Sequence, residues 1–181
     1  MQNHSGMEER LKKIKAFAFD VDGVLTDGGI LADTKGELYR TFDAKDGMAF
    51  RMASMKGYPV AVITGGRSES IKARFNTLGV DSKDIYLCSR AKIEDFEDFC
   101  TRYGLAAEEV MYFGDDLPDI PVMVACGCGV CPSDAVDEVK EIADIVSERP
   151  GGKSLAREMI QKVMTLHGTW NLDVQEYKRK F

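Results

Sequence analysis

The sequence predicts an α/β protein with a doubly wound parallel sheet, and two observations support this fold class. Short apolar runs alternate with segments of helical periodicity along most of the 181 residues. Asp20, Thr64 and Asp115 each follow the apolar residues of a predicted strand, and ligands bind beyond the carboxyl ends of parallel strands. Alternating strands and helices form βαβ units, whose helices cover both faces of one sheet.

The predicted strands are short and apolar, and the predicted helices lie between them. Strands are expected at residues 16–21, 58–63, 85–87, 110–113, 127–130 and 142–146. Helices are expected at 47–56 and 68–78, and a further helix is indicated by Ile93, Phe96, Cys100 and Tyr103, which recur at helical spacing. The length suits a single domain with one core.

Residues 28–43 interrupt this alternation. Two β-prone arms flank a turn signal at residues 33–36, which predicts a β-hairpin flap beside the first strand. A lone hairpin is marginally stable in water, so its apolar side chains are expected to pack against another surface, such as a second subunit. These side chains are Ile30, Leu31, Leu38 and Phe42.

Composition excludes several classes of function. A net charge of −6 argues against nonspecific nucleic-acid binding, which depends on clustered Lys and Arg. No apolar run approaches the ~18 residues of a membrane span. The polar start of the chain lacks the apolar stretch of a secretory signal, so a cytoplasmic location is expected. An anionic substrate remains compatible with an acidic protein when a metal reverses the charge locally.

The cysteines suggest neither a disulfide framework nor a firm metal site. Their number is five, which is odd, and three of them form a Cys-Gly-Cys-Gly-Val-Cys run at residues 126–131. The run could form half of a zinc site, but the only histidines are His4 and His167, and no second ligand pair occurs at the required spacing. A short buried strand explains the run better.

Asp20 and Asp22 form the most informative pair in the chain. Side chains at i and i+2 of an extended segment lie on one side of the backbone, so both carboxylates can address one small site. One can attack phosphorus, while the other protonates the leaving oxygen and later activates water. The alternative is that the acidic pair caps a turn, because Asp-Gly is a common turn dipeptide.

A phosphate would require a cation beside these carboxylates. Two unit charges about 4 Å apart repel by ~4 kcal/mol at an effective dielectric constant of 20. A hard, oxygen-seeking ion such as Mg²⁺ offsets this repulsion, and Asp20 with Asp115 of the second acidic cluster, residues 114–119, suits it.

Two further segments suit a phosphoryl group. Thr64 and Gly65 open a turn whose hydroxyl and amides can bind an anion, and Lys92 opens a helix with a compact positive charge. The alternatives are an ordinary glycine turn with a helix cap at Ser68 and a solvated surface lysine. Both alternatives stay open on these residues alone.

Four segments resemble, in order, the four motifs of the haloacid dehalogenase (HAD) superfamily of phosphatases. They are Asp20 to Thr26, Thr64-Gly65, Lys92, and Gly114 to Asp119. The resemblance is closest to the small capless branch of this superfamily. Three segments carry this narrower match: residues 25–28, which lead into the hairpin, residues 42–47, which follow it, and residues 151–158. The resemblance divides the chain into an N-terminal extension (1–14), a HAD-like phosphatase domain (15–167, flap about 28–43, no cap domain) and a C-terminal tail (168–181).

The resemblance implies a role for each matching residue. Asp20 would be the nucleophile and a Mg²⁺ ligand, Asp22 the general acid/base that also gives its backbone carbonyl to the metal, and Asp115 the remaining ligand. Asp116 and Asp119 would orient the metal site, and Thr64, Gly65 and Lys92 would hold the phosphoryl oxygens. The implied substrate-binding residues are Asp43, Ala44, Lys45, Asp46, Gly47, Arg51, Arg67, Arg74 and Arg157.

The resemblance also implies a homotetramer, built through the flap hairpins, with the C-terminal tail reaching a neighbour's active site. Lys153 and Arg157 are then candidates for closing that site, and the alternative for each is an ordinary surface cation. The chain departs from the pattern of this branch at Gly66, which moves Arg67 one place further from Thr64. The tail beyond His167 matches nothing in the pattern and is expected to be extra surface or disordered.

The resemblance further implies Mg²⁺-dependent hydrolysis of a phosphorylated 3-deoxy-2-keto sugar acid. The eight-carbon octulosonate 8-phosphate is favoured, with its product entering lipopolysaccharide synthesis. The first alternative is a nine-carbon nonulosonate 9-phosphate of the sialic-acid type. The second is a non-catalytic HAD-like assembly module, against which the intact Asp20, Asp22, Lys92 and Asp115 argue.

Overall fold

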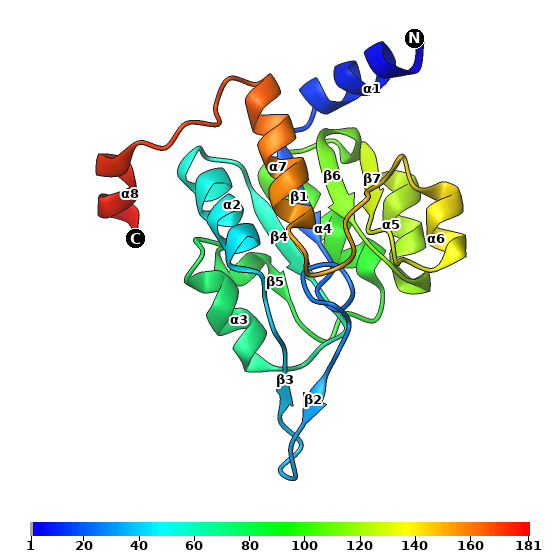
Figure 1. The fold of residues 1–181 in the computed structure, drawn as a ribbon, viewed down its shortest axis with the longest axis vertical. Helices are drawn as coiled ribbons and strands as arrows, with labels where there is room; N and C mark the ends of the chain where they lie inside the picture. The colour runs from blue at the N-terminus through cyan, green and yellow to red at the C-terminus, as the bar shows by residue number, and fades with distance from the viewer. Residues whose placement is uncertain (1) are drawn as a thin grey trace.

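The computed structural model describes residues 2–181 and contains one six-stranded sheet with helices on both faces (Figure 1). The strands lie in the order β5-β4-β1-β6-β7-β8, and every pairing between them is parallel. Their bounds are β1 (Ala16–Phe19), β4 (Val60–Ile63), β5 (Ile85–Tyr86), β6 (Val110–Phe113), β7 (Cys128–Cys131) and β8 (Ile145–Val146). The predicted fold class is confirmed.

The central strand β1 shows how the sequence builds two cores. Its side chains alternate between the faces, so Phe17 and Phe19 enter one core while Ala16 and Ala18 enter the other. Phe19 stacks on Phe113 with ring centroids 4.3 Å apart. Each fully buried phenylalanine of this kind contributes about 1.5–3 kcal/mol to folding.

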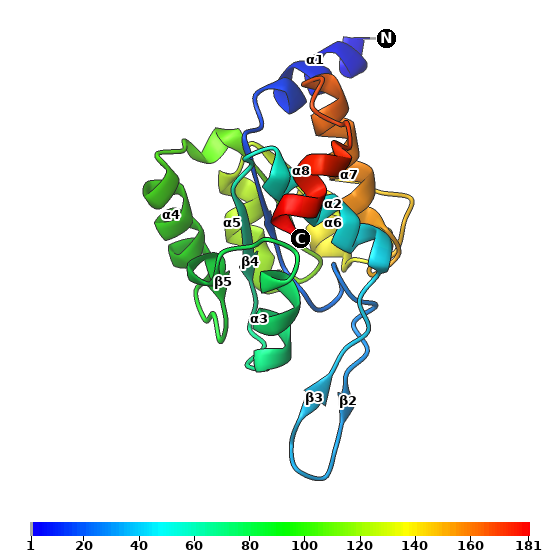
Figure 2. The ribbon, with the colours of Figure 1, turned by 90° about the vertical axis from the view of Figure 1, so that its left-hand side faces the viewer.

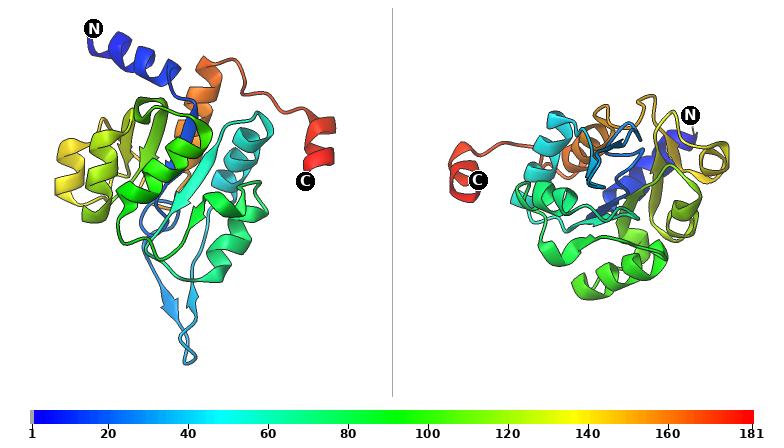
Figure 3. Two further views of the ribbon diagram at one scale, coloured as in Figure 1. Left: turned by 180° about the vertical axis from the view of Figure 1, so that it is seen from behind. Right: turned by 90° about the horizontal axis from the view of Figure 1, so that it is seen from below.

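Helices cover the sheet on both sides (Figures 1 and 3). The phenylalanine face of β1 is covered by α1 (Gln2–Lys12), α2 (Ala44–Met55), α3 (Glu69–Asn76) and α7 (Leu155–Leu166). The alanine face is covered by α4 (Lys92–Tyr103), α5 (Ile120–Ala125) and α6 (Asp137–Ile142). Among these helices, as the structure describes them, none has the length and apolar character that a membrane span requires.

The chain reverses its direction of winding at β1, which has β4 on one side and β6 on the other. Ligands of open α/β sheets bind at such a switch point, beyond the carboxyl ends of the strands. Asp20 follows β1, Thr64 follows β4, and Gly114 and Asp115 follow β6. The three segments predicted to carry the chemistry therefore meet at one edge of the sheet.

The predicted flap is a hairpin of β2 (Leu31–Ala32) and β3 (Leu38–Tyr39), which projects beyond this edge (Figures 1 and 2). Its turn is held by Asp33, whose Oδ1 accepts hydrogen bonds from the backbone N–H groups of Lys35 at 2.8 Å and Glu37 at 3.0 Å. Ile30 is 47% exposed and Leu31 is 71% exposed. The flap thus carries apolar side chains that one chain leaves uncovered.

Two local predictions need correction. The strand predicted at 142–146 is shorter, because Ile142 ends α6 and only Ile145–Val146 pairs with β7; a short apolar run does not distinguish a helix end from a strand. The helix predicted at 47–56 begins at Ala44, because Asp43 accepts a hydrogen bond from the N–H of Lys45 at 2.6 Å and caps it. Short 3₁₀ helices occur at η1 (Ser82–Asp84), η2 (Ala107–Glu109) and η3 (Leu117–Asp119).

The C-terminal tail forms a surface helix, which agrees with the first of its two expected alternatives, extra surface, and not with disorder. It ends in α8 (Val174–Lys180), and Asp173 caps this helix by accepting from the N–H groups of Gln175 and Glu176 at 2.8 and 3.0 Å. A long connection carries α8 to the outside of α2 of the same chain (Figure 3). There Lys180 Nζ donates to the backbone oxygen of Ser54 at 2.6 Å.

Candidate active site

The site is built around Asp20, at the end of the buried strand β1. Its backbone N–H donates to the carbonyl of Phe113 at 2.9 Å, so the parallel pairing of β1 with β6 continues into the site. The residue is 6% exposed, and one carboxylate oxygen lies 2.8 Å from Nζ of Lys92. Asp20 is therefore a nearly buried carboxylate fixed by the sheet.

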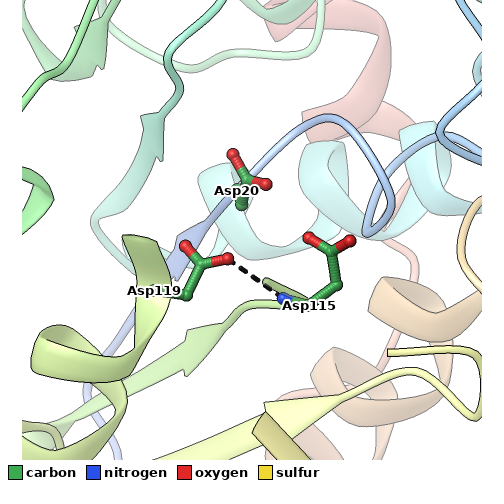
Figure 4. A group of neighbouring side chains, drawn as sticks. All are labelled: Asp20, Asp115 and Asp119. Atoms are coloured by element: carbon green, nitrogen blue, oxygen red, sulfur yellow. Dashed lines mark hydrogen bonds between the residues drawn. The ribbon is translucent and has the colours of Figure 1, made fainter. Parts of the chain in front are cut away.

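Asp115 and Asp119 join Asp20 from the loop after β6 (Figure 4). Each of the three carboxylates offers one oxygen, and these oxygens lie within 4.8 Å of one another. Burial and the negative charge of its neighbours raise the pKa of Asp115 to about 8. Burial and the charge of Asp119 raise the pKa of Asp20 to about 6, against the opposing effect of Lys92. The single ammonium group of Lys92 therefore does not neutralise the three carboxyl groups.

A divalent cation fits this cluster. Asp115 Oδ1 is buried without a hydrogen-bond partner, which is costly for a carboxylate unless a cation coordinates it. A Cβ atom on Gly23 would lie only 2.0 Å from Oδ2 of Asp115, and Gly23 also has a φ of +92°. Glycine at this position therefore leaves the space that the carboxylate occupies. Asp20 and Asp115 are the two side chains best placed to hold Mg²⁺.

Asp119 has a different environment, because both of its oxygens already accept hydrogen bonds. Oδ1 accepts from Lys92 Nζ at 2.7 Å and from the hydroxyl of Tyr112 at 2.6 Å. Oδ2 accepts from the backbone N–H groups of Asp115 at 3.0 Å and Asp116 at 3.3 Å, as the dashed line of Figure 4 indicates for the first. This fully buried carboxylate therefore fixes the loop that carries Asp115, while its role in orienting a metal site stays a prediction.

Lys92 is the first residue of α4 and is 8% exposed. Burial lowers the pKa of its ammonium group, but attraction by Asp20 and Asp119 outweighs burial, so the pKa lies above its usual value. The lysine is therefore charged, and it lies where its charge can meet a phosphoryl group attached to Asp20. The alternative of a solvated surface lysine is wrong.

Thr64 and Gly65 lie at the end of β4, next to β1. Thr64 is 1% exposed, and its Oγ1 accepts a hydrogen bond from the N–H of Gly66 at 3.0 Å. Its backbone carbonyl accepts from the N–H of Ser89 at 2.9 Å, which joins this turn to the segment leading into α4. The turn and Lys92 are thus held together, while the role of Thr64 and Gly65 in phosphate binding stays a prediction.

Asp22 forms a two-pronged ion pair with a residue that the sequence did not indicate. Arg40, at the base of the flap, donates from Nε to Oδ1 at 2.6 Å and from Nη2 to Oδ2 at 2.9 Å. No local pattern predicts this pair, since the two residues are 18 positions apart and join through the hairpin. The contact of Tyr112 with Asp119 was not predicted either, because the position of Tyr112 in an apolar strand indicates only a core residue.

The segment after the flap is joined to the start of α7. Ser154 donates to Asp43 at 2.6 Å, and the N–H of Arg157 donates to Oδ1 of Asp46 at 2.7 Å. Burial raises the pKa of Asp46 to about 6, and its other oxygen is buried without a partner.

Two of the predicted substrate-binding residues, Lys45 and Arg157, line an adjacent open cavity of about 580 Å³. Arg74 packs closely against Gly47, because a Cβ atom on Gly47 would lie only 2.7 Å from Nη2 of Arg74.

Four of the predicted residues lie away from the carboxylate cluster. Arg51 donates to the hydroxyl of Tyr177 at 2.6 Å, so it faces the tail helix α8. The exposed side chain of Asp116 caps η3 by accepting from the N–H of Leu117 at 2.7 Å. Arg67 is exposed beside the tip of the flap, and Lys153 is exposed before α7. The structure shows no hydrogen bond or ion pair between the side chains of these four residues and those of Asp20 or Asp115.

The fold and the aspartate–lysine site define a class of hydrolase. The chain belongs to the haloacid dehalogenase-like hydrolases, whose family model matches residues 37–127. It is 35% identical over 162 residues to the 3-deoxy-D-manno-octulosonate 8-phosphate phosphatase KdsC of Haemophilus influenzae, an alignment that covers 90% of this chain and 89% of the relative. KdsC of Escherichia coli K12 is 34% identical, with 88% and 84% covered.

Solved structures of related proteins have the same fold as this chain. The 3-deoxy-D-manno-octulosonate 8-phosphate phosphatase of Yersinia pestis superposes with a TM-score of 0.86 at 31% identity, covering 90% of this chain and 86% of that chain. The enzyme of the same name from Moraxella catarrhalis has a TM-score of 0.85 at 26% identity, with 90% and 92% covered. That structure holds a magnesium ion, a phosphate ion and a molecule of KDO.

Proposed function

We propose that this chain is a Mg²⁺-dependent phosphatase that hydrolyses 3-deoxy-D-manno-octulosonate 8-phosphate to phosphate and the free sugar acid. The observation that carries the proposal is the buried Asp20, which lies between Lys92 and the unpartnered Asp115 oxygen at the switch point of the sheet. The relatives that span most of the chain act on this substrate by name. The product would then enter lipopolysaccharide synthesis.

The reaction divides into two steps at Asp20. In the first, an Asp20 oxygen attacks phosphorus, the bond to the sugar oxygen breaks, and Asp22 gives its proton to that oxygen. In the second, Asp22 takes a proton from water, the water oxygen attacks the aspartyl phosphate, and the bond to Asp20 breaks. Phosphate leaves, and both carboxyl groups return to their starting states. Bound Mg²⁺ would neutralise the charge of the phosphoryl oxygens.

The remaining side chains bind and orient. Lys92 would exchange its contact with Asp20 for a phosphoryl oxygen as the new bond forms, while Asp119 keeps the ammonium in place. Thr64 and Gly65 would hold the other oxygens through the hydroxyl and backbone amides. Asp43 to Gly47, with Arg74 and Arg157, would meet the sugar acid, and the tie between Asp46 and Arg157 supports this placement.

One assay separates this function from the alternatives. Phosphate release with Mg²⁺ is measured from the eight-carbon 8-phosphate and from a nonulosonate 9-phosphate, with Asp20→Asn as the control. The proposal expects turnover of the first at a kcat/KM at least roughly tenfold higher, a difference of ~1.4 kcal/mol. Preference for the second substrate would select the sialic-acid type. Turnover of neither would leave a non-catalytic module.

We also propose a homotetramer in which the flaps pack together. The exposed flap residues Ile30, Leu31 and Tyr39 support this arrangement, because contiguous apolar patches of this kind mark interfaces. The mass of the particle is measured by light scattering for the parent and for Leu31→Asp, which should dissociate it. A monomeric parent would contradict the proposal.

A cytoplasmic location is proposed as well, which the five free thiols support.

A further inference from the structure

Arg40 brings a side chain of the flap into the active site. The flap strands that precede it are largely exposed, yet the side chain of Arg40 is only 1% exposed. Its guanidinium group contacts both carboxylate oxygens of Asp22, at 2.6 and 2.9 Å. Fork-shaped contacts of this kind are the strongest side-chain hydrogen bonds and fix both partners. The flap therefore ends in a cation at the catalytic edge.

The same guanidinium lies over the turn that follows β4. A Cβ atom on Gly66 would lie 3.1 Å from Nη2 of Arg40 and 3.2 Å from Oγ1 of Thr64. Arg40 is therefore close to the threonine that is predicted to hold the phosphoryl group. The absence of a side chain at position 66 leaves room for this guanidinium, whereas Arg67, the next basic residue, is exposed.

The contact with Arg40 occupies both carboxylate oxygens of Asp22. Both oxygens of Asp22 point at N–H groups of Arg40, whereas proton transfer requires an oxygen of Asp22 within about 2.6–3.2 Å of the reacting substrate atom. A phosphate monoester brings more negative charge and more acceptor oxygens than one carboxylate, so it can compete for the guanidinium fork.

We propose that Arg40 is a substrate-binding residue that moves from Asp22 onto the phosphoryl group of the incoming ester. This inference rests on the proposed function and adds a residue to it. The exchange turns Asp22 toward the substrate only when an anionic group is present at Thr64. Because Arg40 belongs to the flap, the position of the flap then follows the occupancy of the site.

The test compares two Arg40 variants with a control of equal charge change. Arg40→Gln removes the cation, Arg40→Lys keeps the charge without the fork, and Lys35→Gln removes an exposed cation from the flap tip. KM and kcat for octulosonate 8-phosphate and the inhibition constant of inorganic phosphate are measured with saturating Mg²⁺. Formation of the free sugar acid is followed, so that added phosphate does not disturb the assay.

Arg40→Gln should raise both KM and the inhibition constant of phosphate roughly 10- to 100-fold, as loss of a charged fork predicts, with a smaller change in kcat. Arg40→Lys should fall between this variant and the parent, and Lys35→Gln should stay within about twofold of the parent. A role confined to fastening the flap would instead lower kcat and the melting temperature without changing phosphate affinity.

Two results would overturn the inference, and a third concerns the proposed function alone. An active parent whose phosphate inhibition constant is unchanged in Arg40→Gln would contradict it, as would a loss of kcat at constant KM. A parent that turns over no sugar phosphate contradicts the proposed function instead. If Arg40→Gln fails to fold, the inhibition constant of folded Arg40→Lys decides, because the fork is lost there too.

Discussion

The ammonium group of Lys92 lies 2.8 Å from a carboxylate oxygen of Asp20, so the proposed nucleophile and the proposed phosphate-binding cation form an ion pair. The pair is nearly buried, since each side chain is less than a tenth exposed. Lys92 also contacts Asp119 at 2.7 Å. The lysine therefore links Asp20, at the end of β1, to Asp119, in the loop after β6. Its charge stabilises the site before substrate arrives.

Replacement of Lys92 by methionine should abolish activity and destabilise the fold. Removing one partner of a buried ion pair leaves an uncompensated charge, which costs roughly 3–5 kcal/mol. Urea unfolding without metal should report this loss, and Mg²⁺ should restore part of it by neutralising Asp20. Lys92→Arg is the control that keeps the charge. Unchanged stability in Lys92→Met would contradict the buried ion pairs of Lys92 with Asp20 and Asp119.

Asp20→Asn should lose phosphate release while keeping the fold. The amide has nearly the volume of the carboxylate but cannot form the aspartyl phosphate, so turnover should fall below detection. Because burial and Asp119 disfavour the ionised form of Asp20, the melting temperature without metal should be no lower than that of the parent. Retained turnover would require another nucleophile.

Much of the fold could be predicted because its signals are local. The apolar runs that became β1, β4 and β6 were each followed by chemistry-bearing residues, and parallel pairing brings such residues to one edge. Asp20, Thr64 and Asp115 follow from this rule, whereas the residues alone left Lys92 open and only the family resemblance implied its role. Arg40 follows from neither, because its contact with Asp22 depends on how the flap folds back. The start of α2 and the whole of α6 were also not predicted, since Asp43 caps α2 and the apolar Ile142, which ends α6, was assigned to a strand.

The stability of the metal-free protein should fall as pH rises from about 4 to 8. In the folded chain the pKa of Asp20 is raised to about 6 and that of Asp115 to about 8, from a usual value near 4. A carboxyl group with a raised folded-state pKa binds more protons folded than unfolded in this range, so raising the pH favours unfolding. Thermal denaturation after chelation of metals measures the trend.

Mg²⁺ should reverse this dependence. The cation binds the ionised carboxylates, so its affinity should rise with pH between about 6 and 8 and its binding should release protons. Titration calorimetry in buffers of different ionisation enthalpy counts the protons released. Affinity that is independent of pH would contradict Asp20 and Asp115 as ligands, and Asp116→Asn is the matched control at an exposed carboxylate of the same loop.

Tyr112→Phe should lower the affinity for Mg²⁺, although Tyr112 is not one of the proposed metal ligands. The hydroxyl donates to Oδ1 of Asp119 at 2.6 Å, and its loss leaves Lys92 as the only remaining donor to that oxygen. Loss of one buried hydrogen bond to a carboxylate costs about 1.5–3 kcal/mol of stability. Mg²⁺ affinity should fall by up to roughly tenfold, because Asp119 positions the N–H and side chain of Asp115.

The control for Tyr112→Phe is Tyr103→Phe, which removes a hydroxyl that donates to Asp84 at 2.5 Å on the far part of α4. This variant should lose stability while its Mg²⁺ affinity stays unchanged. Equal effects of the two variants on Mg²⁺ affinity would mean that the hydrogen bond to Asp119 has no particular influence on the site. Unfolding by urea and metal titration together separate the two quantities.

Asp46→Asn should stabilise the protein at pH 8 and have little effect below about pH 4. The raised pKa of about 6 means that the ionised Asp46 is disfavoured in the fold, so its stability contribution is lost as pH rises through that value. The asparagine oxygen still accepts from the N–H of Arg157, and the gain in the free energy of unfolding at pH 8 should be on the order of 1–3 kcal/mol.

The same variant tests whether Asp46 binds substrate. If Asp46 also binds the sugar acid, KM for the substrate should rise in this variant. A stabilised variant with unchanged KM would restrict Asp46 to joining α2 and α7.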